Sequence, residues 1–297
     1  MSSVYVFPGQ GSQTVGMGYE LYKNNNDARA VFDEMDNALG EKLSDIIFNG
    51  PMETLTMTEN VQPAILATSV AMFRAAKIPM ADYVAGHSLG EYTALCVAGS
   101  ISLTDAIKLV RLRGKSMQNA VPAGQGAMAV ILGMEIEDLK SVCETAEKQT
   151  GLVCDIANDN CPGQIVISGA NEAIEKAMEI AKEHGARRAM KLALSVPPHS
   201  RLMLPVVEIM RDALDKIEIK KPVVPIISNK TCEPMNDVNE IKESLIYQIT
   251  HGVRWRESVL SMVDMGIDNL TEIGPGNALT GLVNRTTDKI NTHKLEI

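Results

Sequence analysis

The first third of the chain contains the stretch Tyr83-Val84-Ala85-Gly86-His87-Ser88-Leu89-Gly90-Glu91. Its short apolar beginning predicts a buried strand, and the run from Leu89 to Ala98 predicts a helix directly after it. Between them, Gly86-x-Ser88-x-Gly90 has the pattern of a nucleophile elbow, a sharp strand-to-helix turn in which glycines relieve the crowding. Such a turn would expose the Ser88 hydroxyl above a helix N-terminus, whose free N–H groups favour negative charge.

The same residues also fit a capping box, Ser-x-x-Glu, in which Ser88 would only cap the helix and Glu91 would complete the box. Five-residue Gly-Ser-Gly patterns also arise by chance. This stretch alone therefore leaves a catalytic serine and a capping serine open, and the rest of the chain has to distinguish between them.

The composition of the 297 residues is that of a globular enzyme with one domain or one and a half. The net charge of −9 argues against nucleic-acid binding through bulk charge. The five cysteines form no C-x-x-C pair, which argues against a metal site or a disulfide framework and favours a reducing compartment. We expect a cytoplasmic protein, because the N-terminus does not resemble a signal peptide and no window of about eighteen apolar residues predicts a membrane span.

Strands and helices alternate along most of the chain, which predicts a mostly parallel sheet with helices on both faces. The first expected strand, Val4 to Phe7, enters a glycine-containing turn. This turn is not a dinucleotide-binding motif, because Thr14 stands where the third glycine should be. Besides the strand expected at 83–85, further strands are expected at 223–228 and 270–273. Helices are expected at 18–39 with a break at 24–26, 43–48, 60–77, 104–120, 201–216, 241–249, 256–265 and from 278.

The middle of the chain has a different order of elements. Strands are expected at 127–132, 152–157, 164–168 and 187–194, and helices at 135–150 and 171–184. The order β-α-β-β-α-β is that of the ferredoxin-like split unit. We therefore expect residues 127–194 to form a subdomain inserted into a larger α/β body, which residues 1–126 and 195–297 would form.

Ser88 needs a base, because an aliphatic hydroxyl is a weak nucleophile at neutral pH. Among five histidines, His199 follows Pro197-Pro198, which stiffen its loop, and lies where the body resumes. A lone loop histidine is nevertheless more often structural or exposed. Arg113 lies among apolar helical residues and is either a surface arginine with a buried stem or a bidentate clamp for a substrate carboxylate.

Six motifs, in order along the chain, together resemble those of the malonyl-CoA:acyl carrier protein transacylase family. They are Phe7-Pro8-Gly9-Gln10-Gly11-Ser12-Gln13, Gly86-His87-Ser88-Leu89-Gly90-Glu91, Leu112-Arg113-Gly114 with Met117-Gln118, Val196-Pro197-Pro198-His199, Gln248 with Val253-Arg254-Trp255, and Glu272-Ile273-Gly274-Pro275-Gly276. The resemblance runs from the first expected strand to the last helix. It favours a catalytic Ser88 and His199, on an α/β-hydrolase-like body with the inserted ferredoxin-like subdomain.

The resemblance implies an acyltransferase that moves a malonyl group from malonyl-CoA to the phosphopantetheine thiol of acyl carrier protein. The mechanism would be ping-pong, through a malonyl ester of Ser88 with His199 as base. An oxygen near Gln248, instead of a third acid, would orient the imidazole. The backbone N–H groups of Gln10 and Leu89 would form the oxyanion hole.

The resemblance also assigns the substrate contacts. Arg113 would hold the malonyl carboxylate, His87 would support the site, and Asn160 would lie on the coenzyme side of the cleft. The chain departs from the family at His251-Gly252, where proline is common, and this leaves the orientation of His199 open.

We expect no metal, no cofactor beyond the coenzyme A thioester substrate, no nucleic-acid or membrane partner, and a monomer. A serine hydrolase or thioesterase, with water as the acceptor, is the alternative, and a non-catalytic binding module is a more distant one. The best local basic cluster for docking an acidic carrier protein is Arg187, Arg188 and Lys191.

Overall fold

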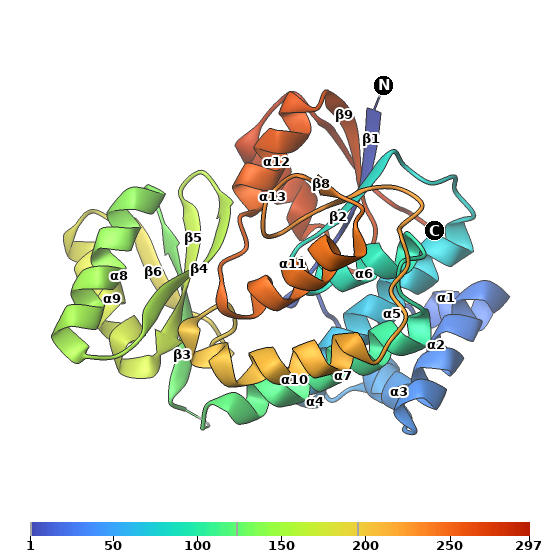
Figure 1. The fold of residues 1–297 in the computed structure, drawn as a ribbon, viewed down its shortest axis with the longest axis horizontal. Helices are drawn as coiled ribbons and strands as arrows, with labels where there is room; N and C mark the ends of the chain where they lie inside the picture. Colours follow the sequence, from blue (N-terminus) through green and yellow to red (C-terminus); the bar gives the residue numbers. More distant parts are fainter. Residues whose placement is uncertain (1, 123, 195) are drawn as a thin grey trace.

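The computed structural model describes residues 2–122, 124–194 and 196–297. They form two parts around separate sheets, a larger body and a smaller subdomain, the latter at the left of Figure 1. Both ends of the chain lie in the body (Figure 1). Residue 195, where the sequence predicts that the body resumes, lies outside the described residues, so the domain boundaries stay a prediction.

The sheet of the body has the strand order β10-β9-β1-β2-β7-β8. All neighbouring strands are parallel except β7 and β8. The mostly parallel sheet predicted from the alternation of strands and helices is therefore confirmed. The strands are β1 (Ser2–Phe7), β2 (Tyr83–Gly86), β7 (Ile226–Ile227), β8 (Pro234–Met235), β9 (Ile267–Glu272) and β10 (Asn291–Lys294).

Helices cover both faces of this sheet because successive strand residues point to opposite sides. Phe7 and Val84 belong to the large core beneath one face, while Val6 and Ala85 belong to the core of the other face. The first face carries α1 (Tyr19–Asn24), α2 (Asn26–Leu39), α3 (Leu43–Asn49), α4 (Met52–Thr56), α5 (Thr58–Ala76), α6 (Leu89–Val97), α7 (Leu103–Ala120), the 3-10 helix η1 (Arg201–Met203), α10 (Leu204–Asp215) and α11 (Val238–Thr250). The second carries α12 (Trp255–Asp264) and α13 (Ala278–Thr286).

The subdomain contains β3 (Gly126–Leu132), α8 (Ile136–Thr150), β4 (Cys154–Cys161), β5 (Gln164–Ala170), α9 (Asn171–Glu183) and β6 (Arg188–Lys191). Its antiparallel sheet has the order β4-β5-β3-β6, the ferredoxin-like arrangement that the sequence predicts. Alternate residues of β3 divide between two surfaces. Ala127 and Ala129 pack under α8 and α9, whereas Met128 and Val130 face the body and line a cavity.

Two arginines of the body tie the subdomain to it. Arg201 pairs with Glu147 of α8 and Asp155 of β4, and Arg256 donates to the buried carboxylate of Asp159 at 2.9 Å. A backbone bridge joins Asn158 of β4 to Val253. Strand β4, whose Asn158 lines the cavity, is therefore hydrogen-bonded directly to the body.

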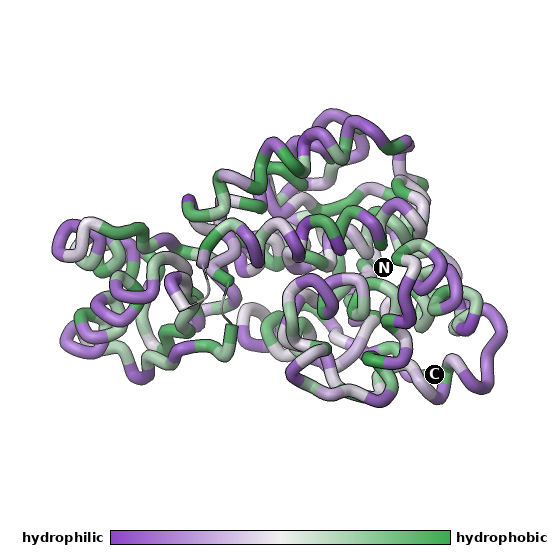
Figure 2. Tube along the Cα trace, turned by 90° about the horizontal axis from the view of Figure 1, so that it is seen from below, coloured by the Kyte–Doolittle hydropathy of each residue, from purple (hydrophilic) through white to green (hydrophobic). Residues whose placement is uncertain are grey.

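The predicted elements differ from the structure mainly in short or polar segments. The strand expected at 223–228 is reduced to β7, and α4, β8 and β10 were not predicted. His293 lies in β10 and pairs with Thr271 through the backbone. Hydropathy alternates along the helices in Figure 2, as expected when one face of each packs on a core. Within the described residues, no helix is both long enough and apolar enough to cross a bilayer.

Candidate active site

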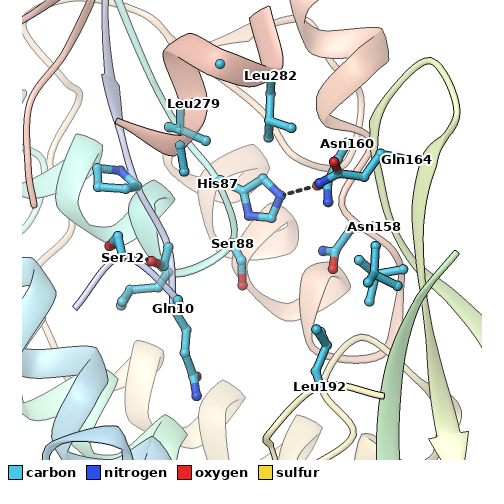
Figure 3. A pocket seen from close by; sticks show the side chains of 18 of the residues that line it. Gln10, Ser12, His87, Ser88, Asn158, Asn160, Gln164, Leu192, Leu279 and Leu282 are labelled. Carbon is cyan, nitrogen blue, oxygen red and sulfur yellow. Dashed lines mark hydrogen bonds between the residues drawn. The ribbon is translucent and has the colours of Figure 1, made fainter. Parts of the chain in front are cut away.

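The carboxyl ends of the parallel strands meet at one edge of the sheet, and a cavity of about 790 Å³ opens there between the body and the subdomain. Gln10 follows β1 and Ser88 follows β2, and both line this cavity. In Figure 3, Gln10 and Ser12 lie on one side of Ser88, and Asn158, Asn160 and Leu192 of the subdomain lie on the other.

The turn at Ser88 is as sharp as the elbow pattern predicts. A Cβ on Gly86 would stand 1.9 Å from the carbonyl carbon of Gly90, and one on Gly90 would stand 2.0 Å from the oxygen of Phe7. Ser88 itself has φ of 53° and ψ of −107°, a conformation that a non-glycine residue keeps only when its surroundings enforce it. The glycines are therefore required by the close approach of β1, β2 and α6.

Ser88 does not act as a capping-box residue. Its side chain accepts no bond from the first turn of α6, and the Glu91 carboxylate binds groups of the core instead of the Ser88 N–H. The capping interpretation left open by the sequence is therefore wrong, and the Ser88 hydroxyl remains available to the cavity.

Asn229, which follows β7, holds the elbow in its strained shape. Its Oδ1 accepts the Ser88 N–H at 2.9 Å, and its Nδ2 donates to the Gly86 oxygen at 2.7 Å. The residue is almost fully buried. Asn229 was not predicted from the sequence, although a polar residue directly after a strand at the active edge of the sheet is a usable signal.

We expect Asn229→Ala to lower the acylation rate of Ser88 by about 10- to 100-fold with any acyl thioester. The reason is that a buried N–H and a buried carbonyl lose their partners, at about 1–3 kcal/mol each. Acylation by malonyl-CoA and by acetyl-CoA, followed by mass spectrometry, measures this loss. Asn229→Asp keeps the acceptor for the Ser88 N–H and should lose less of the acylation rate. Equal losses in the two variants would contradict the role of Asn229 in holding the elbow.

The imidazole of His199 reaches Ser88 from 111 residues away. Nε2 lies 2.8 Å from the Ser88 Oγ, and Nδ1 lies 2.6 Å from the Gln248 oxygen and 3.2 Å from the His251 oxygen. Carbonyl oxygens only accept, so the proton is on Nδ1 and Nε2 is free to accept the serine proton. No acid is needed to orient this ring, and the main chain at His251-Gly252 contributes to its orientation.

Burial and the nearby Arg113 charge lower the pKa of His199 to about 3, although the hydrogen bonds that its Nδ1 donates to the Gln248 and His251 carbonyls act in the opposite direction. His199 is therefore neutral at physiological pH, as a general base must be. Its backbone has a left-handed φ of 60°, and its N–H donates to the Ile249 oxygen, which fixes the strained loop.

Arg113 is buried, with 2% of its surface exposed, so the interpretation as a surface arginine is wrong. Nη1 donates to Gln62 Oε1 at 2.9 Å, and Nη2 donates to Gln248 Oε1 at 2.9 Å and to Ser88 Oγ at 3.2 Å. Within the described residues, no carboxylate lies within ion-pair distance of the guanidinium. A cation of this kind, directed at the nucleophile, is suited to a substrate with a carboxylate of its own.

The remaining predicted residues lie around Ser88, His199 and Arg113. Leu89 begins α6, where the first N–H groups have no partner within the helix, and Gln10 lines the same cavity. His87 lies against Trp255 and its Nε2 donates to Asn160 Oδ1 at 2.9 Å, the dashed line in Figure 3. Asn160 thus joins the subdomain to the elbow. Seven of the eight predicted residues line one cavity, and the eighth, Gln248, is buried behind it and bonded to Arg113 and His199; the roles of all eight stay predictions.

The structure also places Gln62 in the site, through its bond to Arg113. No local pattern in the sequence marks Gln62 as a site residue, because it lies in the apolar run of α5. No three or more His, Cys, Asp or Glu side chains among the described residues are grouped to hold a metal ion.

Comparisons with a family model and with curated proteins both identify acyl transferases as the relatives of this chain. The family model described as the acyl transferase domain matches residues 4–297. The malonyl CoA-acyl carrier protein transacylase of Bacillus subtilis (strain 168) is 48% identical over 290 residues, which are 97% of this chain and 91% of that protein.

Solved structures agree with this match. A crystal structure of the acyl-carrier-protein S-malonyltransferase of Bartonella henselae has a TM-score of 0.97 at 45% identity, covering 100% of this chain and 96% of that one. A malonyl-transacylase solved in complex with its type II PKS acyl-carrier protein has a TM-score of 0.94 at 40% identity, covering 99% and 95%. The family predicted from the six motifs is thereby confirmed: this chain belongs to the malonyl-CoA:acyl carrier protein transacylase family of acyl transferase domains.

Proposed function

We propose that this protein transfers the malonyl group of malonyl-CoA to the phosphopantetheine thiol of acyl carrier protein, through a malonyl ester of Ser88. The observation that supports this most strongly is the convergence of two groups on one oxygen. His199 Nε2 and Arg113 Nη2 lie 2.8 Å and 3.2 Å from the Ser88 Oγ. A base beside the nucleophile fits acyl transfer, and a buried cation fits an acyl group that ends in a carboxylate.

In the first half-reaction, the Ser88 oxygen attacks the thioester carbonyl while His199 Nε2 takes the hydroxyl proton. Backbone N–H groups of Leu89 and Gln10 stabilise the resulting oxyanion, and a donor of this kind is typically worth about 10²–10³ in rate. The carbon–sulfur bond then breaks, the coenzyme A thiolate takes the proton from His199, and the malonyl ester remains on Ser88.

The second half-reaction reverses these steps with a different thiol. His199 takes the proton of the carrier-protein pantetheine thiol, and its sulfur attacks the ester carbonyl. The carbon–oxygen bond breaks, and Ser88 recovers its proton from His199. Arg113 holds the malonyl carboxylate throughout, so the acyl group stays in place while the thiols exchange.

The reaction as proposed uses no cofactor or metal, and we propose a cytoplasmic monomer as the working form. The hydrolase alternative differs only in the acceptor of the second step. Incubation of the protein with malonyl-CoA and holo acyl carrier protein distinguishes them. We expect malonyl-carrier protein to form faster than free malonate, with a malonyl adduct on the Ser88 peptide; faster release of malonate would overturn the proposal.

A further inference from the structure

Glu91 is a buried carboxylate to which the mechanism above gives no role. It lies in the first turn of α6, three residues after Ser88, and it has no exposed surface. Its Oε1 accepts from Ser244 Oγ at 2.7 Å and from the Asn229 N–H at 3.3 Å. Its Oε2 accepts from Gln248 Nε2 at 2.6 Å. Burial raises the pKa of Glu91 to about 7, while the three donors and the Arg113 charge favour its ionised form, and a buried carboxyl group held in this way calls for an explanation.

The amide of Gln248 lies between Glu91 and Arg113. Its Nε2 faces the carboxylate, and its Oε1 accepts from Arg113 Nη2 at 2.9 Å. An amide has donors at one end and an acceptor at the other. Because the Glu91 carboxylate accepts only the donor end, it compels Gln248 to present its oxygen to the guanidinium.

In this arrangement, the amide oxygens that contact Arg113 do not neutralise its charge. A carboxylate in direct contact would neutralise the guanidinium and compete with the substrate, whereas an amide oxygen orients it without cancelling its charge. Gln62 Oε1 does the same on Nη1. The guanidinium is thus held from two sides by neutral oxygens, and Nη2 is directed at Ser88.

We infer that Glu91 is a positioning residue that acts through the side chain of Gln248 to fix Arg113 in the orientation that receives the substrate carboxylate. The inference rests on the proposed malonyl transfer and adds to it a determinant of acyl-group selectivity that does not touch the substrate. Gln248 serves both halves of the site, since its backbone oxygen orients His199 and its side chain orients Arg113.

Glu91→Gln tests the inference with almost no change of shape. The new side chain keeps one oxygen for Ser244 and Asn229 but turns an NH₂ group toward Gln248. Two donors then face each other, so the Gln248 amide has to turn over and present its own NH₂ to Arg113. We expect kcat/KM for malonyl-CoA to fall by about 10- to 100-fold, mainly through KM, while acetylation of Ser88 by acetyl-CoA changes less than threefold.

Gln248→Met provides a second route to the same result, because it removes the amide and leaves the backbone oxygen that orients His199. We expect the malonyl-to-acetyl ratio to fall as it does in Glu91→Gln, and in the double variant Glu91→Gln/Gln248→Met to fall no further than in the worse single variant. This second variant keeps the inference testable if Glu91→Gln does not fold.

Asp36→Asn is the matched control. Asp36 is another buried carboxylate, bound to the Ser44 N–H and hydroxyl in α2 and α3, outside the cavity. We expect it to lower the melting temperature without changing the malonyl-to-acetyl ratio. Equal losses with both acyl groups, or additive losses in the double variant, would overturn the inference that Glu91 positions Arg113 through Gln248. A wild-type protein that acquires no malonyl adduct on Ser88 would instead refute the proposed function.

Discussion

His199→Ala is expected to lower kcat for malonyl transfer by roughly 10⁴-fold, the upper end of what a positioned general base contributes. The Ser88 hydroxyl loses the acceptor 2.8 Å away, and within the described residues no other side-chain base bonds to it. KM for malonyl-CoA should change little, because the group proposed to hold the carboxylate of the substrate is Arg113 and not His199. Steady-state kinetics with malonyl-CoA and holo acyl carrier protein provide the measurement.

His293→Ala is the control for this prediction, because it removes an exposed imidazole from the edge strand β10. It should leave kcat unchanged. A His199→Ala variant that keeps more than a tenth of the wild-type rate would exclude His199 as the base.

The wild-type pH profile tests the same assignment without a mutation. Because burial and the Arg113 charge lower the His199 pKa to about 3, the base stays deprotonated far below the usual 6.5 of a histidine. With p-nitrophenyl acetate, which has no carboxylate to bind Arg113, the acylation rate of Ser88 should stay level from pH 8 to below pH 6. A fall centred near pH 6.5 would show that the imidazole is solvated, contrary to the structure.

The sequence was most informative where a function depends on a local turn. The elbow around Ser88 could be predicted from two glycines, because Gly86 is crowded by Gly90 within the same five residues, although Gly90 itself is crowded by the distant Phe7 of β1. The split β-α-β-β-α-β unit could be predicted from the order of its elements. The likeness of six ordered motifs to a known family then selected His199 and Arg113 from several candidates that the chain left open.

The hydrogen-bonded pairs that support the site could not be predicted in the same way, because the two members of each pair are distant in sequence. Asn229 binds Ser88 across 141 residues, and Gln248 binds Glu91 across 157. No local pattern of hydropathy or spacing encodes such pairs. Strand β10 was missed for a related reason: its polar sequence has no apolar alternation, and only the backbone of β9 makes it a strand.

Arg113→Ala is expected to lower kcat/KM for malonyl-CoA by about 30- to 5,000-fold. The reason is that the malonyl carboxylate would be left as an unpaired buried charge, which typically costs roughly 2–5 kcal/mol. Acetylation of Ser88 should lose far less, because acetyl-CoA has no carboxylate for the guanidinium to hold. The ratio of the two adduct rates, read by intact-protein mass spectrometry, measures the selectivity directly. Arg113→Lys should recover only part of it, since one ammonium group cannot reproduce the planar fork that binds Gln62 and Gln248 and is proposed to bind the substrate as well.

The neighbouring Arg111 provides the matched control, because it is also a buried arginine of α7 but binds Asn60 and Glu41 away from the cavity. Arg111→Ala should lower stability and leave the malonyl-to-acetyl ratio unchanged. Arg113→Ala has a second effect that a purely structural arginine would not produce. Its charge is one cause of the low His199 pKa, so removing it should move the acid limb of Ser88 acetylation to higher pH. A loss of malonyl selectivity together with this shift of the acid limb would show that one guanidinium acts on both the substrate and the base. Equal losses for the two acyl groups would exclude Arg113 as the group that binds the malonyl carboxylate.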